Sequence, residues 1–101
     1  MRCCTLLPVW QVKVTRKAAK QLGRLPKQIQ GYFDRLAKEL EVEGPMQPNW
    51  PHFGKLKGGE NLYHCHIKSG RPTYVACWVV TDREIKLMEV YYVGTHENAP
   101  Y

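Results

Sequence analysis

The sequence lacks the signatures of several large classes of protein. It has no run of about 18 apolar residues, and its start has no small-residue cleavage site of the kind that ends a signal peptide. It has no Walker motif, no GxSxG nucleophile motif and no dinucleotide-binding fingerprint. It also lacks the clustered Asp and Glu residues that hold the metal ions of metal-dependent nucleases. We therefore expect no membrane segment, and no bound metal or other cofactor.

Cysteine motifs are missing as well. Cys3 and Cys4 are adjacent, so an ordinary disulfide cannot join them, and no CxxC pair occurs. This usage is typical of a reducing compartment, and we expect a cytoplasmic protein. Cys65 and Cys77 are then expected to be small buried apolar residues and not nucleophiles.

Acidic residues are scarce relative to basic ones. Nine Asp and Glu stand against 15 Lys and Arg, which gives a formal net charge of +6. This balance favours an anionic partner such as a nucleic acid, an acidic protein or an anionic surface. The charged residues from Lys13 to Lys27 are all basic. That pattern fits a phosphate contact, a docking surface for an acidic partner, or a solvated helix face.

Four segments have the alternation of apolar and polar side chains that is typical of strands. Residues 10–14 form the first, and residues 62–67, 73–80 and 85–93 form the others. Gly70 marks a turn between the second and third of these segments.

The region between the first and second strands predicts two helices. Thr15 is a suitable N-cap for a helix over residues 16–25, and Pro26 suits the first turn of a second helix. The second helix has an apolar stripe made of Ile29, Phe33, Leu36 and Leu40. The resulting order is β-α-α-β-β-β. It predicts a single α+β domain over residues 1–101, with an antiparallel sheet packed against an N-terminal helical hairpin.

The segment Tyr63-His64-Cys65-His66-Ile67 is the most informative part of the chain. Alternate residues of a strand share a face, so Tyr63, Cys65 and Ile67 are expected to point into the core. His64 and His66 would then lie side by side on the other face, about 7 Å apart along the strand. Because imidazole titrates near neutral pH, such a pair can supply a proton donor and a proton acceptor.

These histidines also have plainer interpretations. They can be ordinary surface residues of a sheet. A structural zinc site would need further ligands from His52, His96 and the cysteines, and Cys65 is expected on the opposite face.

Other residues near these strands extend the candidate site, although the cations among them also fit a solvated rim and the last residues also fit a disordered end. The set is rich in cations and in groups that titrate near neutrality, and it is poor in carboxylates. That chemistry suits metal-independent RNA cleavage, in which a base activates the ribose 2′-OH, cations stabilise the pentacoordinate phosphorus, and an acid protonates the leaving oxygen. The candidate set comprises Lys55, Lys57, His64, His66, Arg71, His96, Glu97 and Tyr101.

The order and spacing of these motifs resemble the RelE/ParE superfamily of type II toxin–antitoxin toxins, in its RelE-like branch. The resemblance covers essentially the whole chain and is carried by KLKG, YHCHI and EVYYVGTHENAPY. It implies a ribosome-dependent mRNA endonuclease that enters the ribosomal A site and inhibits translation. It also implies a cognate antitoxin that neutralises the toxin, with operator DNA bound only through the toxin–antitoxin complex.

The resemblance also implies roles for particular residues. His64 and His66 stand where the RelE pattern has two lysines, and either would act as general base. His96 stands for a late arginine and would act as general acid or phosphate ligand. Arg71 matches an arginine approximately, and Tyr101 would stack on or orient a base. Further contacts to the RNA or its phosphates would come from Lys55, Lys57 and Glu97, with Lys57 joining Arg71 in stabilising charge.

Two alternatives remain open at this point. The ParE-like branch shares the fold but inhibits DNA gyrase and would not need the histidines. A non-catalytic protein of the same fold would only bind an antitoxin.

Overall fold

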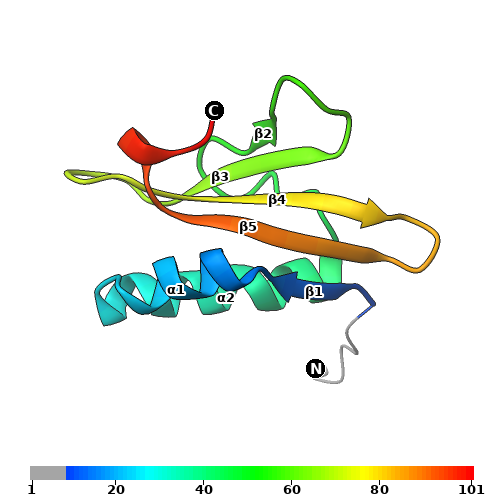
Figure 1. The fold of residues 1–101 in the computed structure, drawn as a ribbon, viewed down its shortest axis with the longest axis horizontal. Coiled ribbons are helices and arrows are strands. Elements are labelled where there is room, and N and C mark those ends of the chain that lie inside the picture. The colour runs from blue at the N-terminus through cyan, green and yellow to red at the C-terminus, as the bar shows by residue number, and fades with distance from the viewer. Residues whose placement is uncertain (1–8) are drawn as a thin grey trace.

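The computed structural model describes residues 9–101, so Cys3 and Cys4 lie outside the described part. Figure 1 shows a sheet with two helices on one side and the C-terminal end on the other. The elements, in chain order, are β1 (Gln11–Val14), α1 (Arg16–Gly23), α2 (Lys27–Glu43), β2 (Gly54–Lys55), β3 (Leu62–Lys68), β4 (Tyr74–Asp82), β5 (Leu87–Thr95) and the short 3₁₀ helix η1 (His96–Asn98). In the described residues no helix combines the length and apolar character needed to cross a bilayer.

The five strands form one sheet in the order β1-β5-β4-β3-β2. Strands β3, β4 and β5 pair antiparallel, as expected, and β2 adds to β3, also antiparallel. Strand β1 joins β5 in parallel, with Val12 opposite Met88. The sheet is therefore mixed and not wholly antiparallel. Parallel pairing needs a long connection, and here two helices and three strands separate the partners. Strand β2 was not predicted, because two residues are too few to display a period of two.

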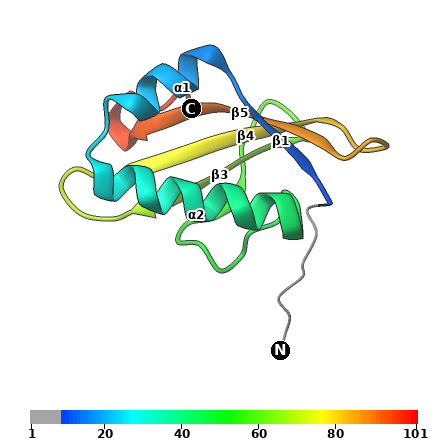
Figure 2. The same ribbon diagram turned by 90° about the horizontal axis from the view of Figure 1, so that it is seen from below.

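Both helices lie on the same face of the sheet, α1 along β5 and α2 along β3 (Figure 2). The Thr15 side chain accepts a hydrogen bond from the Ala18 amide at 3.0 Å, which confirms the predicted N-cap of α1. Pro26 is the N-cap of α2, and Gly44, with φ of 92°, ends that helix. The four residues of the predicted apolar stripe are all buried against the sheet. The helices thus provide the main core and leave the other face for the site.

That other face has a smaller apolar cluster, formed by Leu56, Val75, Cys77 and Tyr92, against which Ala99 packs. Cys77 lies in this cluster, whereas Cys65 lies in the core beneath the helices. Both thiols are free and buried, as expected. Burial raises the pKa of the Cys77 thiol to about 12, so the nucleophilic thiolate is disfavoured there.

Tyr92 fixes the path of the chain as it leaves β5. Its hydroxyl donates a hydrogen bond to the Thr95 carbonyl at 2.7 Å. The His96 amide donates to the Thr73 carbonyl at 2.8 Å, which ties η1 to the start of β4. A side chain on Gly94 would disturb this arrangement, because its Cβ would lie 2.7 Å from the Tyr92 hydroxyl oxygen.

Gly94→Ala is therefore expected to lower the free energy of unfolding by about 1–3 kcal/mol, the usual cost of overpacking. The matched control is Gly31→Ala in α2, where no neighbour lies within 4 Å of the added Cβ. That variant is expected to gain about 0.5–1 kcal/mol, because alanine favours a helix over glycine. Urea unfolding measures both changes. A Gly94→Ala protein as stable as wild type would contradict the packing described.

Candidate functional site

The alternation along β3 places its side chains as predicted. Tyr63, Cys65 and Ile67 are buried in the helix-side core, with exposed fractions of 1%, 0% and 5%. His64 and His66 lie on the opposite face and are half-buried. One short strand therefore contributes to the core and to the candidate site at the same time.

All four histidines of the sequence meet on this face, together with Tyr101. The His52 and His66 rings stack at 4.1 Å between centroids, and His96 approaches His66 edge-on at 5.4 Å. Tyr101 lies 4.8 Å from His64 and 5.9 Å from His96. We call these five side chains the ring cluster. They come from a loop, a strand, η1 and the end of the chain, and the fold alone brings them together.

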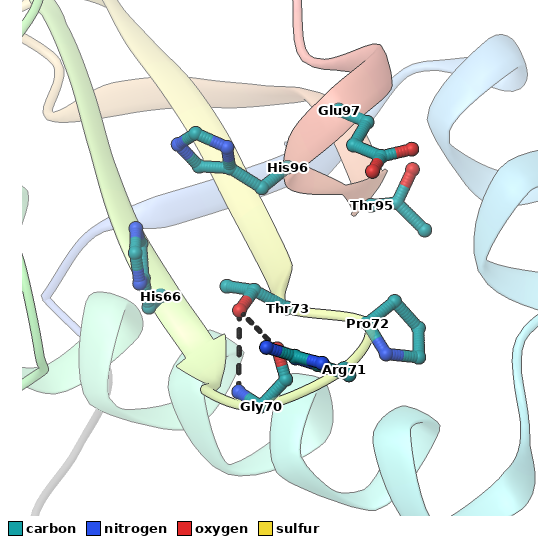
Figure 3. Close-up of a pocket in the computed structure, with 8 residues that line it drawn as sticks. All are labelled: His66, Gly70, Arg71, Pro72, Thr73, Thr95, His96 and Glu97. Atoms are coloured by element: carbon teal, nitrogen blue, oxygen red, sulfur yellow. Dashed lines mark hydrogen bonds between the residues drawn. The ribbon is translucent and has the colours of Figure 1, made fainter.

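A hollow of about 610 Å³ opens beside the cluster. Figure 3 shows that His66 and His96 border it, with Arg71 entering from the turn between β3 and β4. Glu97 also lines the hollow, but its carboxylate lies on the side of η1 away from His66. The remaining lining residues are Gly70, Pro72, Thr73 and Thr95. The side chains that line the hollow thus include two imidazoles, one guanidinium, two hydroxyl groups and one carboxylate.

A hydrogen bond defines the protonation of His64. Its Nδ1 lies 3.2 Å from the Gly54 carbonyl oxygen. A carbonyl oxygen only accepts hydrogen bonds, so Nδ1 carries a proton and is the hydrogen-bond donor. In the neutral ring, Nε2 then has the free lone pair.

The environment favours the neutral forms of the two β3 histidines. Burial lowers the pKa of His64, the hydrogen bond to Gly54 opposes this shift, and the nearby His96 and His52 add to it. Burial likewise lowers the pKa of His66, and the neighbouring His52, His96 and His64 lower it further. At neutral pH both rings are therefore able to accept a proton. Burial raises the pKa of Tyr101, which keeps its hydroxyl protonated.

The two lysines of the candidate set lie apart from the hollow. Lys55 is in β2 opposite Tyr63, and Lys57 follows that strand; both are exposed. Within residues 9–101, neither is among the residues that line the hollow. Their positions suit contacts with a long ligand beyond the hollow.

His52 was missed as a site residue by reasoning from the sequence, which considered it only as a zinc ligand. It lies in a loop without periodicity, where no spacing connects it to the strands. The zinc alternative itself finds no support in the described part of the chain, where no group of three or more His, Cys, Asp or Glu is arranged to hold a metal ion. His52 and His66 stack face to face, whereas metal ligands direct their nitrogens at one point.

No protein-family model and no curated protein matches the sequence. Solved structures do match the fold. RelE of the RelE–RelB complex from Pyrococcus horikoshii OT3 superposes with a TM-score of 0.71 at 22% identity, over 90% of this chain and 99% of that chain. A mutant of the Escherichia coli toxin RelE in the free state superposes with a TM-score of 0.70 at 20% identity, over 90% of this chain and 87% of that chain.

A third structure, the RelBE2 toxin–antitoxin complex of Mycobacterium tuberculosis, gives a TM-score of 0.64 at 20% identity, over 89% of this chain and 100% of that chain. These agreements show that the chain has the fold of RelE-like toxins. The α+β class predicted from the sequence is thus confirmed.

The lowered pKa values predict how stability depends on pH. Between the folded values and the unfolded value of 6.5, the unfolded chain binds more protons, so the free energy of unfolding falls as pH falls through this window. We expect urea unfolding to show this loss as the pH falls from neutrality through and below the unfolded value of 6.5. The His64→Asn/His66→Asn double variant should lose less over the same range. A wild-type free energy of unfolding that stays constant or rises as the pH falls would contradict the lowered pKa values of His64 and His66.

Proposed function

We propose that this chain is the toxin of a type II toxin–antitoxin system and that it cleaves mRNA on the ribosome. The observation that carries the proposal is the meeting of His66, His96 and Arg71 around one hollow. This set holds two groups for proton transfer and one fixed cation, which are the requirements of RNA cleavage by the ribose 2′-OH. The fold of RelE-like toxins supports the same conclusion.

In this mechanism the scissile phosphate occupies the hollow. His66, which is neutral at pH 7, removes the proton of the 2′-OH, and the 2′ oxygen attacks the adjacent phosphorus. His96 gives a proton to the 5′ oxygen as the bond from phosphorus to that oxygen breaks. The products are a 2′,3′-cyclic phosphate and a 5′-OH. Arg71 stabilises the negative charge that develops on the phosphorus oxygens.

The remaining candidates act around this centre. His64, held by Gly54, contacts Tyr101, whose half-exposed ring is available to stack on a nucleobase. Lys55 and Lys57 contact phosphates that flank the scissile one. Glu97 points away from His66 and accepts a hydrogen bond from a ribose hydroxyl or a base amine.

The partner of such a toxin is a cognate antitoxin. Solved complexes of RelE with RelB from Pyrococcus horikoshii OT3 and from Escherichia coli support this class of partner. Operator DNA is contacted only through the antitoxin complex. The ribosome is the site of action, in the cytoplasm.

Primer extension on a reporter mRNA in a cell-free translation system tests the proposal. The wild-type protein is expected to produce discrete cuts within A-site codons. His66→Ala and His96→Ala should each lower the rate by about 10²–10⁴-fold, the usual contribution of a general acid or base. The matched control is Lys38→Ala on the exposed side of α2, which should cut at the wild-type rate.

Circular dichroism should show that all three variants are folded. Intact mRNA with the wild-type protein would contradict the nuclease. A gyrase supercoiling assay would then test the ParE-like alternative, and normal supercoiling would leave a non-catalytic antitoxin-binding protein.

A further inference from the structure

The loop before β2 forms a bulge against β3. The His66 amide donates to the Pro51 carbonyl at 2.8 Å, and Gly54 lies opposite His64. Two residues, 52 and 53, therefore lie opposite one residue of β3, Cys65, which stands between His64 and His66. This two-against-one count is that of a β-bulge, a feature that is frequent beside active sites because it redirects a side chain.

The bulge sends its two residues to opposite faces of the sheet. Phe53 enters the core, where its ring lies 6.0 Å from that of Tyr63 and 6.2 Å from that of Trp78. His52 has φ of 56°, a left-handed conformation that is uncommon outside glycine, although histidine adopts it more often than most residues. Its ring lies flat against His66, at 4.1 Å and 26° between planes.

The stack involves His66, the β3 histidine that lines the hollow. One face of His66 is covered by His52, and His96 approaches the same ring edge-on at 5.4 Å. His52 itself is not among the described residues that line the hollow.

We propose that His52 is a positioning residue, which holds the His66 ring at the rim of the hollow by stacking on it. The inference rests on the proposed function, because it assigns His52 a part in the same proton transfer. It predicts that removing the His52 ring frees His66 to rotate, and that a different flat ring at residue 52 restores the restraint.

His66 is surrounded by several groups that carry or acquire charge. The stacking partner His52 comes from the loop, His96 and Glu97 come from η1, His64 shares the strand, and Arg71 comes from the following turn. Among these groups, the imidazoles of His52, His96 and His64 oppose protonation of His66 and lower its pKa. Removing one imidazole from this set is therefore expected to ease protonation of His66.

His52→Asn removes the ring and retains a residue that tolerates the left-handed conformation. His52→Phe replaces imidazole by another flat ring that carries no charge. The matched control is Asn49→Ala, an exposed residue of the same loop. Thermal unfolding of each variant reports whether the fold is retained.

Histidine NMR on the free protein tests the stack without any RNA. His52→Asn is expected to remove the ring-current shift of the His66 ring protons and to raise the His66 titration midpoint. His52→Phe should retain a ring-current shift, and Asn49→Ala should match wild type in both respects. A folded His52→Asn protein with wild-type His66 shifts and midpoint would overturn the proposal.

RNA cleavage gives the second measurement. His52→Asn should lower kcat about tenfold with little change in KM, because displacement of a catalytic group slows the reacting step. The acidic limb of its kcat profile should move to higher pH, and His52→Phe should recover most of kcat. An unchanged kcat in His52→Asn would also overturn the proposal. If the wild-type protein cuts no RNA, the proposed function fails, and the NMR result alone decides whether His52 positions His66.

Discussion

The alternation of side chains along β3 is the constraint on which both the fold and the site depend. Tyr63, Cys65 and Ile67 must be buried beneath the helices, so His64 and His66 must lie together on the other face. A slip of one residue would reverse both sets, which would expose the core and bury two imidazoles. The core therefore fixes the register of the site. Any change that preserves the core also keeps these two histidines on the face of the site.

Two supports from outside β3 complete the cluster. The bulge in the loop before β2 places His52 against His66. The hydrogen bond from the Tyr92 hydroxyl to the Thr95 carbonyl directs the chain after β5, so that His96 and Tyr101 lie over the sheet. Burial and the neighbouring imidazoles favour the neutral forms of His64 and His66, since the neighbours oppose protonation of these two rings. For His66 this environment suits a proton acceptor at neutral pH.

Much of the fold could be predicted because its elements have clear periodicity, as in the stripe of α2 and the alternation of β3. The parallel pairing of β1 could not be predicted, because pairing direction depends on the path between distant segments. Among the site residues, His64 and His66 follow from the strand period. The contact of His96 and Tyr101 with them depends on the turn after β5, and His52 reaches the cluster only through a bulge between loop and strand. Neither feature has a local sequence signal.

The central claim is that imidazoles of this cluster activate a ribose 2′-OH without a metal ion. The most direct test uses a reporter mRNA cut in the translation system and the same mRNA with one 2′-deoxynucleotide at the cut site. The account predicts that only the all-ribose message is cut there, that the upstream fragment ends in a 2′,3′-cyclic phosphate, and that His66→Ala slows the cut by about 10²–10⁴-fold. Cleavage at the 2′-deoxynucleotide, or a fragment bearing a new 5′-phosphate, would contradict it.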